Sequence, residues 1–299
     1  MFKVRGAKTF TMYFASSIIA KAIPFFLLPI LTFFLSTEEY GIISIYQVLV
    51  SFTGAIVGMS LQSNITRNFY NRDQEYLATL VFNIIIIAGV SSVLVFFGII
   101  ISLFLGAPTF SITGFWYLML PIISFMQIII ALNLTILRNQ RNSLLFGIFQ
   151  MSRSFFEMTV VVLLVAIMLI GWQGRLYGIL LVHLVLGFVS VIFMFRRGFI
   201  RVSLDLSIIK ESLSVSLPLI PHILGGIVLG LSDRLFVERM AGSSELGVYA
   251  VGYQFGTAIS LITSAVSLTW TPWLYERLSQ ISTVGKIRIV QSIYTLWIG

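Results

Sequence analysis

Residues 77–105 read LATLVFNIIIIAGVSSVLVFFGIIISLFL, and no charged side chain interrupts them. A helix needs roughly 20 apolar residues to cross the hydrocarbon core of a bilayer, and this stretch exceeds that length. Strands of a membrane barrel alternate apolar and polar residues over about ten positions, whereas this run is apolar throughout. The stretch therefore predicts a membrane-spanning helix.

The rest of the chain repeats this pattern. Apolar residues make up 58% of the 299 residues, charged residues only 10%, and the mean hydropathy of +1.00 is far above that of a soluble domain. Eight spans are predicted, at 11–35, 41–65, 77–105, 115–137, 144–170, 176–195, 213–231 and 247–275. Residues 287–299 turn apolar toward their end and are interpreted as the first half of a ninth helix. The predicted fold is an all-α integral membrane bundle.

Basic residues predict the orientation of these spans. The chain has a net charge of +8, but its Lys and Arg residues lie in clusters between apolar runs, which is typical of a topology signal and not of a nucleic-acid-binding face. If the N-terminus is cytoplasmic, fourteen of the nineteen lie on the cytoplasmic side. Three, Arg175, Arg234 and Arg239, lie on the opposite side. Positive residues favour the cytoplasm, so the sequence predicts a cytoplasmic N-terminus.

Two segments that lie six spans apart resemble each other. Residues 36–47 read STEEYGIISIYQ, and residues 242–254 read GSSELGVYAVGYQ. Each lies between the first and second span of its half, and six is an even number of crossings. This resemblance predicts an internal repeat whose two halves cross the membrane in the same direction.

No enzyme signature is present in the sequence. It has no phosphate-binding loop, no zinc-protease motif, no nucleophile elbow and no cysteine, and its two histidines cannot form a His-rich metal site. We therefore expect no catalytic residues, no cofactor and no metal. The informative residues are the ionisable side chains inside the membrane, because each is costly there without a partner or a watery cavity.

Three such side chains are candidates to line a translocation cavity. Lys21 lies mid-way along the first span, where it either snorkels to the interface or faces a cavity, and we favour the cavity. Arg153 and Glu157 lie at i and i+4 in the fifth span and are expected to pair. The pair is either a structural link between helices or a polar wall in which Arg153 meets an anion while Glu157 holds the arginine or takes up a proton.

Other polar residues have simpler interpretations. His183 and His222, mid-span in the sixth and seventh helices, are expected to be hydrogen-bonding core residues rather than proton carriers. Asp233 and Arg234 are interpreted as an interfacial pair that ends the seventh span.

Prolines fall in corresponding helices of the two halves. Pro24 and Pro29 lie in the first span, and Pro218 and Pro221 lie in the seventh. Proline removes a backbone hydrogen bond and bends a helix. Bent helices at matching positions of two repeats indicate a central transport site, so Pro24, Pro218, Pro221, His222, Asp233 and Arg234 are candidate gate residues.

The segment 35–47, the Ser232-Asp233-Arg234 triplet and Gly247-Val248-Tyr249 resemble the polysaccharide-transporter family, the Wzx-type flippases of O-antigen and exopolysaccharide. Their superfamily also holds the multidrug (MATE) exporters. The resemblance covers essentially the whole chain. It implies two six-helix bundles that face each other in a V, with a cationic cavity between them.

The resemblance also implies the function. The substrate would be an oligosaccharide linked through pyrophosphate to a polyprenol, flipped across a bacterial inner membrane by alternating access under an ion or proton gradient. Other polysaccharide-assembly proteins would be partners. Lys21 and Arg153 would meet the anionic head, with Arg67 as a recruiting charge at the cytoplasmic mouth. A multidrug or organic-cation exporter and a membrane-embedded polysaccharide polymerase are the alternatives.

One feature departs from the family. Members usually carry twelve or more spans, and this sequence offers eight and part of a ninth. We expect a complete N-terminal six-helix bundle in residues 1–200 and an incomplete second bundle in residues 201–299, truncated at its C-terminus.

Overall fold

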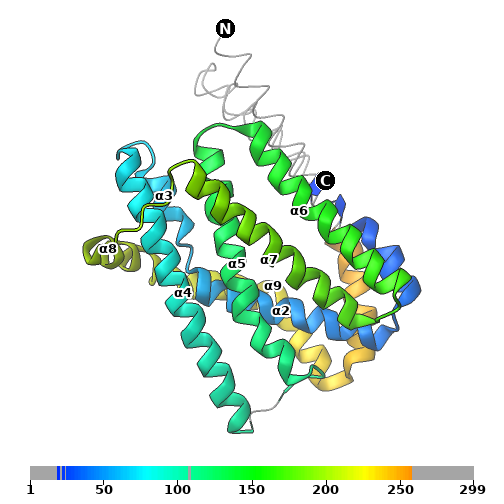
Figure 1. Ribbon diagram of the computed structural model, residues 1–299. Coiled ribbons are helices and arrows are strands. Elements are labelled where there is room, and N and C mark those ends of the chain that lie inside the picture. The colour runs from blue at the N-terminus through cyan, green and yellow to red at the C-terminus, as the bar shows by residue number, and fades with distance from the viewer. Residues whose placement is uncertain (1–18, 21, 24, 107–108, 258–299) are drawn as a thin grey trace, which may run out of the picture. The chain divides into compact units, whose positions relative to one another are not determined.

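The computed structural model describes residues 19–20, 22–23, 25–106 and 109–257, and every secondary-structure element within them is helical (Figure 1). The chain divides into two compact units, 1–252 and 253–299, and the packing reported below lies within the first. The elements are an apolar helix Phe25–Phe34, α2 (Thr37–Gly58), α3 (Gln62–Asn68), α4 (Gln74–Phe104), α5 (Gly114–Asn139), α6 (Ser143–Val162), a π-helical turn η1 (Leu163–Ile167), α7 (Trp172–Arg196), α8 (Leu206–Ser216), α9 (Leu219–Ala241) and a helix over 243–257.

Six helical segments in this part of the chain are long and apolar enough to cross a membrane. They are α2, α4, α5, α6 with η1, α7, and α8 with α9. This confirms the prediction of an all-helical, multi-pass membrane protein. The first and eighth predicted spans extend beyond the described residues, and the predicted ninth helix lies outside them.

Helix α5 is the centre of the bundle, and in Figure 1 it lies between α4 and α7. It packs against α2, α4 and α7, and 67% of its most apolar stretch is buried, compared with 11% for α6 and 6% for α8 with α9. Trp116 of α5 packs edge-on against Tyr46 of α2, with ring centroids 6.0 Å apart. Such pairs add about 0.5–1.5 kcal/mol beyond the area they bury. The weakly buried helices α6 and α9 are therefore peripheral within this unit.

Glu39 connects the starts of two helices. Ser36 caps α2 by accepting from the Glu39 N–H, while the Glu39 carboxylate accepts from the Ser36 N–H at 2.9 Å, which completes a capping box. The other carboxylate oxygen accepts from the Trp172 N–H at 3.2 Å and so holds the first residue of α7. One side chain thus satisfies backbone donors at two helix N-termini.

The predicted second span is not one continuous helix. Helix α2 ends at Gly58, and the next two residues, Met59 and Ser60, have φ angles of 45° and 53° before α3 begins at Gln62. Left-handed conformations of non-glycine residues cost on the order of 1–3 kcal/mol each. The prediction of an unbroken helix over 41–65 was wrong because hydropathy does not detect a backbone break within an apolar run.

The segment between α7 and α8 is attached to α4 through Asn83. This side chain is fully buried; its amide N–H donates to the Ser203 carbonyl at 2.9 Å and its carbonyl accepts from the Asp205 N–H at 3.0 Å. Asp205 then caps α8, and hydrogen bonds from the Ser207 side chain and from backbone N–H groups hold the pKa of that carboxyl below its usual value. The start of α8 is therefore fixed on α4.

The two sequence segments that resemble each other lie face to face. A Cβ added to Gly41 would overlap the carbonyl oxygen of Ser243, and a Cβ added to Gly247 would overlap the carbonyl oxygen of Thr37. Gly41 and Gly247 are 206 residues apart in the sequence, as are Thr37 and Ser243. The contact of Gly41 with Ser243 is therefore equivalent to the contact of Gly247 with Thr37. A two-fold axis relates such pairs of contacts. This reciprocity supports the parallel repeat that the sequence predicts.

Two prolines lie where the predicted seventh span is interrupted. Helix α8 ends at Ser216, Pro218 is the N-terminal flanking residue of α9, and Pro221 lies in the first turn of α9. Proline is tolerated in a first turn because the N–H that it lacks would have no intrahelical partner there. The predicted interruption of the seventh span by proline is confirmed. In the first span, Pro29 lies within the helix Phe25–Phe34, and Pro24 lies outside the described residues.

Candidate translocation site

Four polar side chains from α6 and α7 meet within the apolar part of the bundle. Arg153 and Glu157 lie one turn apart on α6, and Arg175 and His183 lie on the facing side of α7. At 1.5 Å per residue, Arg153 lies about 15 Å from the start of its span and about 20 Å from its end. A guanidinium at this depth is costly unless it has partners or water. The contacts of Arg153 therefore show whether a fixed partner neutralises its charge.

Arg153 donates to a neutral imidazole. Its Nη2 lies 3.1 Å from Nε2 of His183, while Nδ1 of His183 lies 2.7 Å from the carbonyl oxygen of Ile179. A guanidinium has only donors, so Nε2 must accept and the ring proton must be on Nδ1, where it is donated to the carbonyl. His183 is 2% exposed, and its predicted role as a hydrogen-bonding core residue is confirmed.

Glu157 is paired with a residue of the next helix. Its Oε1 lies 2.9 Å from Nη1 of Arg175, and the two side chains are 20% and 8% exposed. The prediction that Glu157 pairs with Arg153 was therefore wrong: Arg175 of α7 binds the carboxylate, and Arg153 binds His183. Arg175, which lies just before the predicted start of the sixth span at 176, is buried in the first turn of α7.

These pairings leave the group with a net charge of +1. Two guanidinium groups carry positive charge, one carboxylate neutralises one of them, and His183 is neutral in the tautomer that its contacts require. Arg153 is half-buried, and its neighbours Ser152 and Phe155 on α6 are exposed. Among the described residues, no carboxylate lies within ion-pair distance of Arg153, and Glu157 on the same helix acts on its charge only at longer range.

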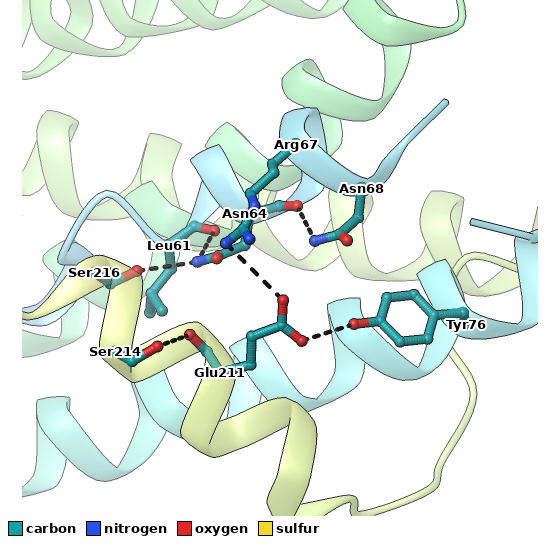
Figure 2. Close-up of polar contacts among 8 residues, drawn as sticks. All are labelled: Leu61, Asn64, Arg67, Asn68, Tyr76, Glu211, Ser214 and Ser216. Carbon is teal, nitrogen blue, oxygen red and sulfur yellow. Dashed lines mark hydrogen bonds and ion pairs between the residues drawn. The ribbon is translucent and has the colours of Figure 1, made fainter. Parts of the chain in front are cut away.

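Arg67 lies apart from this group, on α3. Figure 2 shows its side chain extended toward Glu211 of α8, with a closest N–O distance of 3.9 Å, while Tyr76 donates to the other oxygen of Glu211 at 3.5 Å. Between the same two helices, the Asn64 amide donates to the Ser216 hydroxyl at 3.0 Å. Arg67 therefore links α3 to α8 rather than lining the same site as Arg153.

We expect the two links between α3 and α8 to differ in strength. Arg67→Ala should change the free energy of unfolding by less than about 1 kcal/mol, because both members of its ion pair are exposed. Asn64→Ala should cost about 1–3 kcal/mol, since Asn64 and Ser216 are buried and the serine would lose its partner. Thermal unfolding in detergent compares the two variants; equal losses would contradict this ranking.

The other predicted site residues lie either outside the described part of the chain or on α9. Lys21 and Pro24 lie outside the described residues, although Ala20, which precedes Lys21, accepts a hydrogen bond from Ser154 of α6 at 3.2 Å. Pro218, Pro221 and His222 lie at the start of α9, where His222 is exposed.

Asp233 and Arg234 do not end their helix. Helix α9 continues to Ala241, so the prediction that this pair terminates the seventh span was wrong. Asp233 instead accepts a short hydrogen bond from the Tyr249 hydroxyl, and its other oxygen accepts from the Arg234 N–H at 2.9 Å. The carboxylate thus joins α9 to the helix over 243–257.

A comparison with protein families matches nearly the whole chain. A family model described as "Polysaccharide biosynthesis protein" matches residues 7–277. The chain belongs to this family. The resemblance to polysaccharide transporters that the sequence indicates is thereby confirmed.

Two proteins of Haemophilus influenzae are similar to this member of the family. One, named after the Lsg locus, is 25% identical over 297 residues, which are 96% of this chain and 69% of that protein. The other, named an uncharacterized membrane protein, is 24% identical over 280 residues, 91% of this chain and 66% of that protein. This chain therefore spans about two thirds of the length of these relatives.

A solved structure has the same fold. The crystal structure of a MATE protein with a proline-to-alanine substitution superimposes with a TM-score of 0.61 at 16% sequence identity, over 88% of this chain and 64% of that one. A polysaccharide biosynthesis family with a MATE fold lies in the superfamily of membrane flippases and exporters.

Arg175 is the functional candidate that sequence reasoning missed in this family member. It follows Gly174, one residue before the predicted span 176–195, so the prediction places it outside that span. The helix starts one turn earlier, at Trp172. A signal was available, since an arginine in the turn before an apolar run can pair with an acidic residue of the preceding span, here Glu157.

Proposed function

We propose that this chain translocates an oligosaccharide linked through pyrophosphate to a polyprenol, by alternating access of two helical bundles. One observation carries the proposal: Arg153 lies mid-membrane with a neutral imidazole as its partner, while the neighbouring carboxylate is already bound by Arg175. A positive charge that is not neutralised by a fixed carboxylate is suited to meet the charge of an anion.

The physical task explains why such a charge is needed. A pyrophosphate and several sugars cannot cross hydrocarbon unaided, whereas the prenyl tail is at home in lipid. A guanidinium presents several donors to phosphate oxygens in a fixed geometry. Arg153 at the edge of α6 would hold the anionic head in the bundle while the tail stays in the bilayer. Lys21, if it also faces this space, would add a second cation.

The reciprocal contact of Gly41 and Gly247 supports alternating access. Helix axes can approach closely only where side chains are absent, and here two backbones cross at equivalent positions of the repeat. A close crossing of two smooth surfaces allows one bundle to rotate against the other with little change in side-chain packing. We propose that the bundles rock about this crossing.

The drug-exporter alternative predicts a different site. An organic cation would need a carboxylate without a fixed counter-ion, but Glu157 is bound by Arg175 at 2.9 Å. The pairing pattern of α6 and α7 therefore favours an anionic substrate. The transport test below includes an organic cation for this reason.

Arg153→Gln is expected to lower transport at least about tenfold. A hydrogen bond to a charged group contributes about 1.5–3 kcal/mol, and 1.4 kcal/mol corresponds to a factor of ten. The measurement is surface polysaccharide in a bacterial strain that lacks its own flippase, together with export of ethidium as the organic cation. Arg153→Lys should retain part of the activity because it keeps the charge.

The matched control is Arg196→Gln, the same substitution at an exposed position at the end of α7. It should transport as the unaltered chain does. Equal losses in both variants, or full activity of Arg153→Gln, would refute the role of Arg153. Ethidium export that depends on Glu157 and not on Arg153 would instead identify a cation exporter.

A further inference from the structure

A cavity lies away from the Arg153 group, between α2, α5 and α9. It has a volume of about 270 Å³, enough for roughly nine water molecules at about 30 Å³ each. Its lining includes Ser51, Gly54 and Gly58 of α2, Ser124 and Gln127 of α5, and Gln62 of α3. Neither α6 nor α7 contributes a lining residue, so this cavity is separate from the charged site.

The lining is polar but carries no charge. It combines three serines and two glutamines with small and aliphatic residues. A cavity without a cation is poorly suited to a phosphate, and one without a carboxylate is poorly suited to an organic cation. A hydrocarbon chain would leave the amide and hydroxyl groups without partners. The remaining suitable class of ligand is a neutral molecule with several hydroxyl groups.

Polar atoms of this lining have unused hydrogen-bonding capacity. Ser124 is 1% exposed, yet its hydroxyl has no partner, and the same is true of Oε1 of Gln62. Among the described residues, Gln127 makes no side-chain hydrogen bond. Buried polar groups in proteins are nearly always paired, so these atoms are available to hydrogen-bond a molecule that enters the cavity.

Gly54 keeps the space in front of these atoms open. A Cβ at this position would lie 3.2 Å from Oε1 of Gln127 and 4.0 Å from Oγ of Ser124. Both polar atoms therefore point toward the face of α2 that has no side chain. Backbone strain lies at the same place, since Met59 and Ser60 hold left-handed conformations that bring Ser60 and Gln62 to the cavity. Strain of this kind concentrates at ligand sites.

We propose that this cavity binds one uncharged sugar residue of the lipid-linked oligosaccharide, an inference that rests on the proposed function. Amide groups both donate and accept, as the hydroxyls of a pyranose require. Ile223 and Ile227 of α9 provide the apolar surface on which the C–H face of a sugar ring packs. The sugar and the pyrophosphate are thus bound by different helices, the sugar by α2 and α5 and the pyrophosphate by α6 and α7.

The test measures binding to the purified full chain in detergent. The probes are undecaprenyl pyrophosphate without a sugar and the same lipid carrying glucose, galactose or N-acetylglucosamine. At least one glycosylated lipid should bind about tenfold more tightly than the bare lipid. Gln127→Leu should remove about five- to tenfold of that preference, the loss expected for one neutral hydrogen bond, and should leave the affinity for the bare lipid unchanged.

Two further variants separate the sites. Gly54→Ala places a methyl group in the cavity and should also reduce the preference, whereas Gly98→Ala on α4, where no atom lies within 4 Å, should have no effect. Arg153→Gln should weaken binding of the bare and glycosylated lipids by the same factor. Size-exclusion elution and thermal unfolding identify any variant that fails to fold. If one of Gly54→Ala and Gln127→Leu does not fold, the other still tests the sugar preference.

The outcomes distinguish the two proposals. If the unaltered chain binds all four lipids equally, the sugar assignment is overturned while the flippase proposal stands. If it binds none of them, the flippase proposal fails and the sugar assignment fails with it. Free hexoses that bind as tightly as the glycosylated lipids would overturn the assignment to a lipid-linked sugar.

Discussion

Gly41→Ala is expected to destabilise the protein more than any other single methyl group added to α2. The new Cβ would overlap the carbonyl oxygen of Ser243. Backbone atoms cannot rotate away as a flexible side chain can, so the helices must separate. Overpacking costs about 1–3 kcal/mol in ordinary cores and more where nothing can adjust. We expect a loss near 3 kcal/mol, which lowers the midpoint of thermal unfolding by about 5–10 °C.

The control is Gly58→Ala on the same helix. The nearest atom to its added Cβ is Cδ1 of Ile128 at 4.0 Å, an ordinary contact. Alanine is a better helix former than glycine by about 1 kcal/mol, so this variant should be as stable as the parent chain or more so. A Gly58→Ala loss equal to that of Gly41→Ala would contradict the steric explanation.

The reciprocity of the contact predicts non-additive effects. Gly247→Ala should cost about as much as Gly41→Ala, because a Cβ there would overlap the Thr37 carbonyl at the same crossing. Once one added methyl group has separated the two helices, the second methyl group fits into the widened gap and costs less free energy of unfolding. The double variant should therefore be more stable than the sum of the single losses predicts, by at least about 1 kcal/mol. Strictly additive losses would mean that the two glycines do not share one crossing.

This crossing was within reach of sequence reasoning. The likeness of residues 36–47 to residues 242–254 predicts the repeat, and equivalent segments of a two-fold repeat meet at its axis. The spans were predictable for a related reason, since apolar length alone identifies membrane helices. The repeat and the spans are both set by the sequence pattern, and predicting them does not require knowing which side chains are in contact.

The break after α2 was not within reach. Met59 and Ser60 adopt left-handed conformations, but neither is a glycine or an asparagine, the residues that favour them. No proline marks the break either. Helix α3 packs against α4 and α5, and its Asn64 bonds Ser216 of α8. One sequence does not reveal these long-range contacts. The cavity lined by Ser60 and Gln62 was missed for the same reason.

The partner of Glu157 was missed because two arginines could reach it. Arg153 is four residues away on the same helix, which makes it the obvious partner. Arg175 is on the next helix, and its distance from Glu157 depends on the residue at which α7 begins. That start is fixed by Glu39, whose carboxylate binds the Trp172 N–H. A contact from α2 is thus made at the start of the helix that carries Arg175.

Arg175→Met is expected to destabilise the chain by about 3–5 kcal/mol, the usual cost of removing one partner from a buried ion pair. Glu157 would lose the guanidinium 2.9 Å away while it remains largely shielded from water. Adding Glu157→Gln should restore most of the lost stability, because the double variant has no unpaired charge at this position. Thermal unfolding of the two single variants and the double variant measures the coupling, expected to be at least about 2 kcal/mol. Additive losses would contradict a direct pair.

The same variants test why Arg175 matters for function. Without Arg175, the carboxylate of Glu157 can draw the guanidinium of Arg153, its neighbour four residues away, from His183. Arg153 would then be neutralised, so Arg175→Met should bind undecaprenyl pyrophosphate at least about tenfold more weakly. The double variant with Glu157→Gln removes the competing carboxylate and should regain that affinity, although it still lacks Arg175. Loss of affinity in both variants would mean that Arg175 itself contacts the anion. Recovery in the double variant would assign Arg175 the role of occupying Glu157, so that the charge of Arg153 remains available.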